Sequence, residues 1–249
     1  MLEKSNTIKT EESEKLILEQ GKLGIIAGSG NFPLMFCQKA RDNNCKTVVV
    51  AHKGETEQEI ESVSDTCAWI KLGQLGKLIS TFKQNNVKVA VMAGGISRVK
   101  HFGNLMLDLK GAAFLAKTRS TKDDVVMRAL AKELDSEGIK VVSCLSFFSE
   151  HIVSKGIFSG KKLSKQEKQD VEVGISAIKA ISSEDIGQLV VVREGVVVAV
   201  EAVEGTDATI TRGGALAGAG SVVVKFAKST QDLRFDIPTI GLNLSLIHI

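Results

Sequence analysis

The sequence predicts an α/β protein, with a Rossmann-like parallel sheet in an N-terminal domain and a smaller mixed α/β C-terminal domain that is incomplete at its end. Short apolar runs alternate with segments of helical spacing in the first half, as in doubly wound sheets. Glycine-rich turns follow two of these runs, at Gly28 and at Gly94. In the second half, two β-branched runs joined by Glu194-Gly195 predict a hairpin.

The first domain is expected over residues 22–145, after a charged and polar N-terminal extension, 1–21, with a helix-compatible pattern. Pro33 suits the first turn of a helix, and Gly138 suits the end of one. The expected strands are 22–27, 46–51, 68–72, 87–93 and 139–142, and the expected helices are 32–44, 75–82 and 125–137.

Small residues between the first strand and the first helix predict an anion site. Gly28, Ser29, Gly30 and Asn31 lie where backbone N–H groups and a helix N-terminus can face a phosphate. The G-x-G spacing lacks the later glycine of the dinucleotide fingerprint. A plain tight turn is therefore the alternative.

A second glycine turn follows the strand 87–93. Gly94, Gly95, Ser97 and Arg98 lie beyond its carboxyl end, where open α/β sheets bind their ligands. Arg98 suits bidentate pairing with a phosphate, and the alternative is a solvated surface charge.

The second domain is expected over 146–249, with a boundary near Ser146. A helix is expected over 164–181, hairpin strands over 189–193 and 196–200, and a further strand over 221–227. Between the hairpin and the last strand, the glycine-rich stretch 212–220 predicts a loop, either a phosphate nest or a flexible connector.

Asp236 is the candidate catalytic residue. Pro238 biases Ile237 away from helix, so Asp236 lies on extended chain before a stiff turn. That position suits a carboxylate that holds a metal ion or a water, whereas the alternative is a turn cap. Three more carboxylates, the last of them Asp207, lie in the segment 201–207. Oxygen ligands of this kind suit Mg²⁺ or Mn²⁺.

Composition argues against several classes of protein. A net charge of +3, with 4% aromatic residues and no Tyr, disfavours nucleic-acid binding. The four cysteines form no C-x-x-C pair, which disfavours zinc and indicates reduced thiols in a cytoplasm. No apolar run reaches the roughly 18 residues of a membrane span. Residues 1–21 contain no apolar signal core.

Several motifs, taken in order, resemble the UDP-2,3-diacylglucosamine pyrophosphatase family of lipid A synthesis, in its alternative, Asp-dependent type. The resemblance covers about residues 22–242. The motifs that carry it are KLGIIAGSGNFP at 22–33, AGGISR at 93–98, DIGQ at 185–188, EAVEGTD at 201–207, Arg212, Lys225, and DLRFDIPTIG at 232–241.

The resemblance implies a two-domain hydrolase that converts the nucleotide sugar to UMP and 2,3-diacylglucosamine 1-phosphate. It implies water attack on the α-phosphorus with Mg²⁺, and the family's essential aspartate falls on Asp236. Lys225 and Arg212 are then expected to hold the leaving phosphate, and Asp207 to join Asp236 at the metal. The implied substrate-binding residues are Gly28, Ser29, Gly30, Asn31, Gly94, Gly95, Ser97, Arg98, Gln188, Thr206, Arg212 and Lys225.

The expected partner is a nucleotide-sugar lipid, and no nucleic acid. The expected location is the cytoplasm, with the inner-membrane surface as an option. The oligomeric state is left open, with a homodimer as one option.

The chain departs from the family pattern in three places. Residues 1–21 precede the usual start, Val99 stands where Pro is frequent, and the chain ends soon after the Pro238 turn. The final residues, about 243–249, look foreign to the family. We therefore expect a locally loosened second domain and a poor enzyme.

Two other functions stay open at this point. A nicotinamide-dependent oxidoreductase needs an acidic residue at the end of the second strand, where this chain has His52 and Lys53 before Glu55. A non-catalytic nucleotide-sugar-binding protein is the second alternative.

Overall fold

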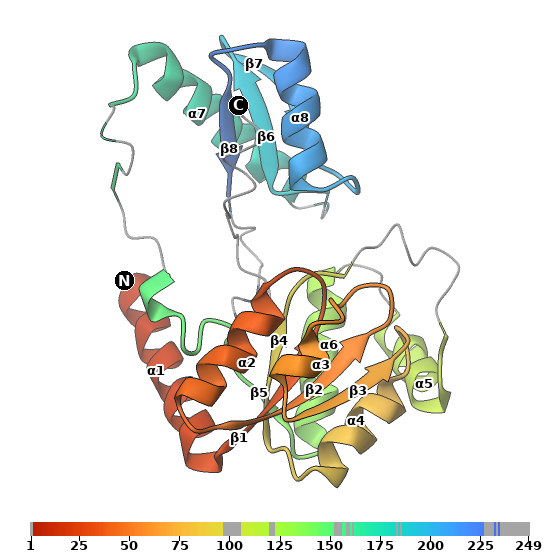
Figure 1. Ribbon diagram of the computed structural model, residues 1–249. Helices are drawn as coiled ribbons and strands as arrows, with labels where there is room; N and C mark the ends of the chain where they lie inside the picture. The colour runs from red at the N-terminus through yellow and green to blue at the C-terminus, as the bar shows by residue number, and fades with distance from the viewer. Residues whose placement is uncertain are drawn as a thin grey trace. The chain divides into compact units, whose positions relative to one another are not determined.

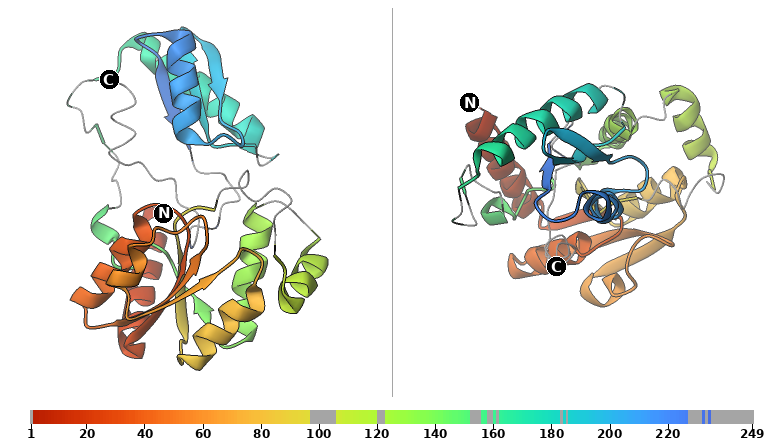
Figure 2. Two further views of the ribbon diagram at one scale, coloured as in Figure 1. Left: turned by 45° about the vertical axis from the view of Figure 1, so that its right-hand side comes forward. Right: turned by 90° about the horizontal axis from the view of Figure 1, so that it is seen from above.

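The computed structural model describes residues 2–96, 106–119, 123–151, 156–157, 160, 162–182, 184, 186–226, 232 and 234. The chain forms two compact units (Figure 1). The first comprises Met1–Ile152 with Asp232–Phe235, and the second comprises Val153–Gln231 with Asp236–Ile249. Figure 2 shows the elements of each unit from two further directions.

A five-stranded parallel sheet forms the centre of the first unit, in the order β3-β2-β1-β4-β5. Its strands are β1 (Lys22–Ala27), β2 (Lys46–His52), β3 (Thr66–Ile70), β4 (Val89–Ala93) and β5 (Lys140–Val141). The predicted α/β class is confirmed. The strand order reverses between β1 and β4, and such a switch point is where open α/β sheets bind ligands.

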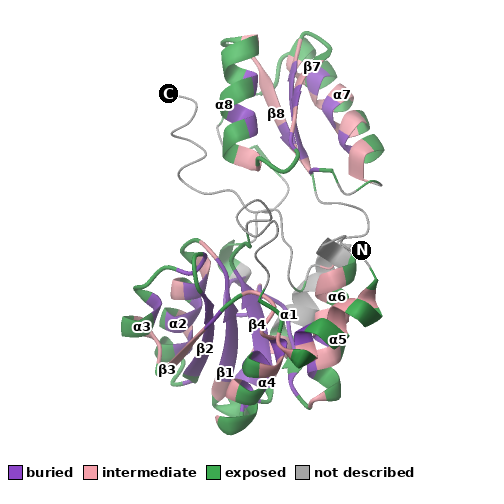
Figure 3. Ribbon diagram, turned by 90° about the vertical axis from the view of Figure 1, so that its right-hand side faces the viewer, coloured by how far each residue is buried: buried purple, intermediate pink, exposed green. Residues whose placement is uncertain are grey.

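Helices cover both faces of this sheet, so its central strands are almost wholly buried (Figure 3). The helices are α1 (Leu2–Gln20), α2 (Phe32–Asp42), α3 (Ile60–Val63), α4 (Leu75–Gln84), α5 (Leu109–Thr118) and α6 (Asp123–Ser136), followed by the short 3₁₀ helix η2 (Ser149–His151). One core joins α4 and α6 to the sheet through residues such as Phe82 and Leu134, both fully buried. Burial on both faces explains why these strands read as continuous apolar runs.

The structure adds three local details to the sequence-based elements of this unit. The final turns of α1 are packed, since Ile17 is fully buried. The third strand ends at Ile70, two residues before its expected end, because the side chain of Gln74 accepts the N–H of Lys71 and closes a turn there. The helices α3 and α5 were not predicted.

The second unit is a three-stranded antiparallel sheet between two helices, in the order β7-β6-β8. Its elements are α7 (Lys165–Ser182), β6 (Leu189–Arg193), β7 (Val196–Val200), α8 (Thr206–Ala217) and β8 (Val222–Lys225). Alternate residues of β6 face opposite helices, as strand geometry requires. Val190 and Val192 pack in the cluster of α7, and Val191 packs with Ile210 of α8.

The predicted loop over 212–220 is wrong, because most of it is the second half of α8. The glycines that suggested a loop allow close packing instead. A Cβ on Gly213 would lie 2.5 Å from a methyl carbon of Val191, so only glycine lets the helix approach the strand this closely. Gly174 likewise allows α7 to pack closely on the sheet, since a Cβ there would lie 2.5 Å from a methyl carbon of Val224.

The predicted hairpin is present with its turn at Glu194-Gly195. Both turn residues have positive φ, 50° and 82°, which is the type I′ pattern. Asp170 of α7 is 1% exposed and accepts the N–H of Gly195 at 2.7 Å and that of Glu194 at 3.1 Å. The turn is therefore fixed to the helix beneath it.

Candidate functional site

The turns that follow β1 and β4 are joined to each other. The N–H of Gly28 donates to the carbonyl of Ala93 at 2.8 Å, and that of Ser29 donates to the carbonyl of Gly95 at 2.7 Å. A Cβ on Gly28 would lie 2.3 Å from the carbonyl oxygen of Gly95, and one on Gly94 would lie 2.4 Å from that of Ser29. The two turns can meet only because both positions are glycine.

This joined pair of turns brings together six of the predicted site residues at the switch point of the sheet. Gly30 has a φ of +84°, and Asn31 is exposed at the start of α2. The first turn of α2 carries no acidic residue, and the Asn31 side chain does not cap it. An unscreened helix N-terminus of this kind attracts anions. The hydroxyl of Ser29 donates to the carbonyl of Gly95 at 3.0 Å.

Three predicted residues cannot be placed. Ser97 and Arg98, expected to contact phosphate, and Asp236, expected to be catalytic, lie outside the described residues.

The second unit brings three predicted residues together around a buried carboxylate. Glu201 is 7% exposed, accepts the hydroxyl of Thr206 at 2.8 Å and accepts the N–H of Gln188 at 3.1 Å. The ammonium group of Lys225 donates to the same Thr206 hydroxyl at 3.3 Å. Lys225 is thus positioned by a short chain of hydrogen bonds that ends on the loop before β6.

Arg212 lies on α8 and pairs with an acidic neighbour. Its guanidinium donates to Glu204 at 2.7 Å and to the carbonyl of Val200 at 3.0 Å. The pKa of Glu204 is lowered by a backbone hydrogen bond within its own residue and by the hydrogen bond from Arg212. A phosphate would have to compete with Glu204 for this arginine.

The carboxylates of 201–207 serve mostly structural roles. Glu201 and Glu204 accept hydrogen bonds from the protein, and Asp207 is exposed in the first turn of α8. Within the part of the chain that the structure describes, no three His, Cys, Asp or Glu side chains gather closely enough to bind a metal ion. Of the two predicted metal ligands, only Asp207 is described, and alone it does not form a divalent-cation site.

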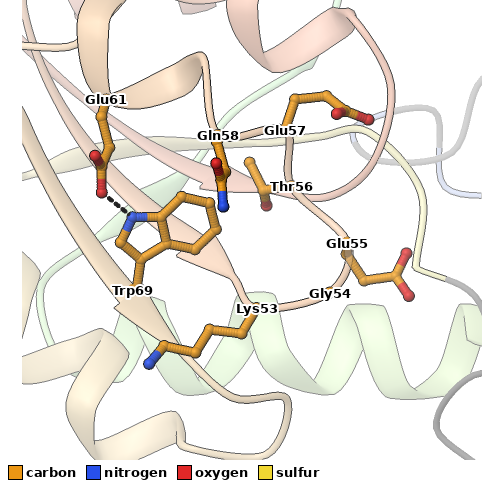
Figure 4. Close-up of a pocket in the computed structure, with 8 residues that line it drawn as sticks. All are labelled: Lys53, Gly54, Glu55, Thr56, Glu57, Gln58, Glu61 and Trp69. Atoms are coloured by element: carbon orange, nitrogen blue, oxygen red, sulfur yellow. Dashed lines mark hydrogen bonds between the residues drawn. The ribbon is translucent and has the colours of Figure 1, made fainter.

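A pocket of about 670 Å³ lies beyond the ends of β2 and β3, lined by residues 53–58, Glu61 and Trp69 (Figure 4). The sequence reasoning did not find it. Thr56 links the pocket to the β1 turn, since its hydroxyl donates to the carbonyl of Ala27 at 2.7 Å. The ring nitrogen Nδ1 of His52 lies 2.8 Å from the same carbonyl. A signal was available in the single tryptophan of the chain and the polar run that follows β2.

The four cysteines, all within the described residues, form no disulfide bond. Burial raises the pKa of Cys37 to about 12, and that of Cys45 and of Cys67 to about 11. Because the thiolate is the reactive form, these three thiols are poor nucleophiles. Within the described residues, no helix has both the length and the apolar character to cross a membrane.

Two family models match the chain almost end to end. The LpxI N-terminal domain matches residues 22–151, and the LpxI C-terminal domain matches residues 154–244. The chain belongs to the LpxI family. The N-terminal match contains the glycine turns and the pocket, and the C-terminal match contains the Glu201 network and Asp236.

A relative comes from Caulobacter vibrioides. This UDP-2,3-diacylglucosamine pyrophosphatase LpxI is 28% identical over 232 residues, which cover 89% of the present chain and 82% of the relative. The predicted family is therefore confirmed.

Proposed function

We propose that the protein hydrolyses the pyrophosphate bond of UDP-2,3-diacylglucosamine, releasing UMP and 2,3-diacylglucosamine 1-phosphate in lipid A synthesis. The observation that carries the proposal is the family match, which runs through both units, 22–151 and 154–244. The UDP-2,3-diacylglucosamine pyrophosphatase LpxI of Caulobacter vibrioides is aligned over 89% of the chain. The enzyme class that follows from the family is a hydrolase.

The geometry of the first unit supports an anionic substrate. The joined turns at Gly28 and Gly94 lie at the switch point of the sheet, beside the N-terminus of α2. The N–H groups of Gly28, Ser29 and Gly95 are already bonded within the joined turns. The groups that would stabilise a phosphate here are therefore the N–H groups at the start of α2 and the dipole of that helix. We assign one phosphate of the pyrophosphate to this turn.

Arg212 would have to leave Glu204 in order to hold the leaving phosphate. We therefore assign the leaving phosphate to Lys225, whose ammonium group donates to the hydroxyl of Thr206. Charge on a departing phosphate is stabilised by a positioned cation in the transition state. Arg212 is assigned to holding α8 against the end of β7 and against Glu204, which precedes the helix.

The requirement for Mg²⁺ or Mn²⁺ stays a proposal that depends on Asp236, because the described residues contribute only Asp207. A divalent ion would neutralise pyrophosphate charge and favour attack by water. Removal of divalent ions with EDTA should abolish turnover, and added Mg²⁺ should restore it.

The decisive experiment compares two aspartates of one segment. Asp236→Ala should lower kcat for UMP release more than a hundredfold, about 2.7 kcal/mol, while substrate still binds. Asp232→Asn is the control, because Asp232 is ion-paired with Arg234 at 2.7 Å and has no assigned part in the chemistry. A kcat within tenfold of the parent for Asp236→Ala would reduce Asp236 to a turn residue.

The location in the cytoplasm, with contact to the inner-membrane surface, remains part of the proposal. Four cysteines without a disulfide bond are compatible with a reducing compartment. Fractionation of cells with and without a high-salt wash would separate a free enzyme from one held at a membrane surface.

A further inference from the structure

We propose that the outer side of α5, with the residues just before it, docks the protein on the surface of an anionic lipid bilayer. This rests on the proposed function, because a substrate with two acyl chains resides in a membrane. It goes further by assigning the contact to one surface of the first unit. We call that surface the α5 face, and it consists of Met106, Leu107, Leu109, Ala112, Ala113 and Ala116.

The outward side of α5 is apolar. The helix residues of the α5 face, at positions 109, 112, 113 and 116, follow the i, i+3, i+4, i+7 spacing of one helix side, and all four are exposed. Leu109 is 94% exposed, and Met106 and Leu107 are 50% and 43% exposed. A continuous exposed patch of apolar side chains marks a site of interaction with a protein or a membrane.

The opposite side of α5 is the packed one. Phe114 packs against the core that joins α4 and α6 to the sheet, and α5 contacts mainly these two helices. Figures 1 and 2 show α5 at the outer edge of the first unit. A surface helix ordinarily has an apolar side towards the core and a polar side towards water. Because α5 is apolar on both sides, its outer side is expected to have a partner of its own.

The start of α5 is held firmly, so the α5 face has a fixed orientation. The carboxylate of Asp108 caps the helix by accepting the N–H of Gly111 at 2.7 Å, and it also accepts the N–H of Lys77 on α4 at 3.1 Å. A Cβ on Gly111 would lie 2.0 Å from the carbonyl oxygen of Gly73, so glycine lets the helix lie directly against the turn after β3.

Cations flank the α5 face at both ends. The ammonium group of Lys71 lies 2.9 Å from the sulfur of Met106 at one end, and Lys117 and Arg119 are exposed at the other end. Within the described residues, none of these three cations is ion-paired with a carboxylate. Long basic side chains beside an apolar patch can reach lipid phosphates while their stems stay in the interface.

Charge and chemistry favour a lipid surface over a protein. Asp108 is the single acidic residue between positions 106 and 119, and its carboxylate is taken up by the cap. The α5 face itself has only Met, Leu and Ala side chains. A protein interface needs hydrogen-bonding groups in fixed positions, whereas a fluid bilayer needs only apolar side chains with cations around them.

Binding of the full chain to vesicles tests the proposal without any substrate. Vesicles of phosphatidylglycerol and phosphatidylethanolamine should sediment the parent protein, vesicles of phosphatidylcholine should sediment far less, and salt should weaken the binding. Leu109→Asp should lower the bound fraction about tenfold, because it places a charge in the apolar contact. An acidic residue in the first turn favours the helix, so α5 should stay folded. Leu18→Asp is the matched control, since Leu18 is 41% exposed on α1.

The cations are tested by a double variant. Lys71→Gln combined with Lys117→Gln should lower binding to anionic vesicles about tenfold. Lys46→Gln combined with Lys88→Gln is the matched control. These two lysines are also exposed, but they lie at the amino-terminal ends of β2 and β4, whereas α5 lies against the turn at the carboxyl end of β3.

Leu109→Trp reports whether the α5 face enters the lipid. Trp69 is the single tryptophan of the parent, so the second indole is measured as a difference between the two proteins. Its emission should move to shorter wavelength with anionic vesicles, because the ring leaves water, and the emission of the parent should not move. Emission that stays unchanged in Leu109→Trp while the protein sediments with vesicles would overturn the assignment to α5.

Hydrolysis separates docking from catalysis. With UDP-2,3-diacylglucosamine in detergent micelles, Leu109→Asp should keep the kcat of the parent. With the same substrate in anionic vesicles, its rate should fall about tenfold, in step with the fraction bound.

The outcomes distinguish the α5 face from the proposed function. Equal sedimentation of the parent and Leu109→Asp, or equal binding to neutral and anionic vesicles, would overturn the docking surface. A dimer that Leu109→Asp dissociates, with no vesicle binding, would assign the face to a second copy and overturn it as well. Vesicle binding without any hydrolysis would support the docking surface and remove the function, and hydrolysis without vesicle binding would do the reverse.

Discussion

The glycine turns of the first unit and the glycines of α8 in the second unit look similar in sequence, but the close contacts that glycine allows there are of different kinds. At Gly28 and Gly94 a missing Cβ lets two backbones touch, with carbonyl oxygens 2.3 and 2.4 Å from where the Cβ atoms would be. At Gly213 a missing Cβ lets a helix touch the side chain of Val191. Glycine content therefore does not by itself distinguish a ligand-binding turn from a tightly packed helix.

Among the substitutions that test this comparison, Gly28→Ala should cause the largest loss of stability. The new methyl group meets backbone atoms of Gly94 and Gly95, which cannot rotate away. We expect a loss of about 3 kcal/mol or more in unfolding free energy, the upper end of overpacking costs. Urea denaturation measures it. Gly30→Ala is the control: nothing lies within 4 Å, but its φ of +84° costs about 1–2 kcal/mol.

Equal losses for Gly28→Ala and Gly30→Ala would contradict the backbone contact. A Cβ at position 28 would then cost no more than the backbone strain at Gly30, and the joining of the two turns at the switch point would not depend on glycine at position 28.

Gly213→Ala should have the next largest effect. Its methyl group meets Val191, a side chain that can adjust, so we expect a loss of about 1–2 kcal/mol after the gain in helix propensity. Val191→Ala in the same chain should recover part of the loss by making room. Gly214→Ala is the matched control, because nothing lies within 4 Å there.

Gly214→Ala should stabilise the second unit by up to about 1 kcal/mol, the propensity difference between Ala and Gly inside a helix. If thermal unfolding showed the same small change for Gly213→Ala and Gly214→Ala, close packing of α8 on β6 would be refuted.

Asp170 should have the smallest effect, which is measured through the pH dependence of stability. Burial pushes the pKa of Asp170 up, but hydrogen bonds from Gly195, Gln166 and Glu194 outweigh it and hold the pKa below its usual value. A lowered folded-state pKa stabilises the fold above the unfolded value, near 3.9, and this stability is lost as pH falls through the folded value.

Asp170→Asn should therefore lower the melting temperature at pH 7, because one amide oxygen cannot replace two carboxylate oxygens at the hairpin turn. The difference from the parent should shrink below about pH 4. Melting curves of both proteins between pH 7 and pH 3 measure it. A difference that stays constant with pH would show that the charge of Asp170 contributes nothing.

The candidate site could be predicted only where the signal is local. The turn at Gly28 follows a buried strand and precedes a proline-marked helix, so position along the chain indicates its place in the sheet. The pocket at Trp69 could not be predicted in this way. It forms from a segment after β2 and a residue on β3, which are separated in sequence and adjacent only through strand pairing.

The sequence alone determined the α/β class, the strands of both sheets to within a few residues, the hairpin turn and the family. These features depend on hydrophobic periodicity, on turn residues such as Glu194-Gly195 and on the order of short motifs, all of which are local. The tertiary structure alone decided that 212–217 is helix, that Glu201 is structural and that Trp69 faces a pocket. Each of these depends on contacts between segments distant in sequence. Val191 explains why position 213 of α8 is glycine, and strand pairing brings Trp69 beside the segment after β2.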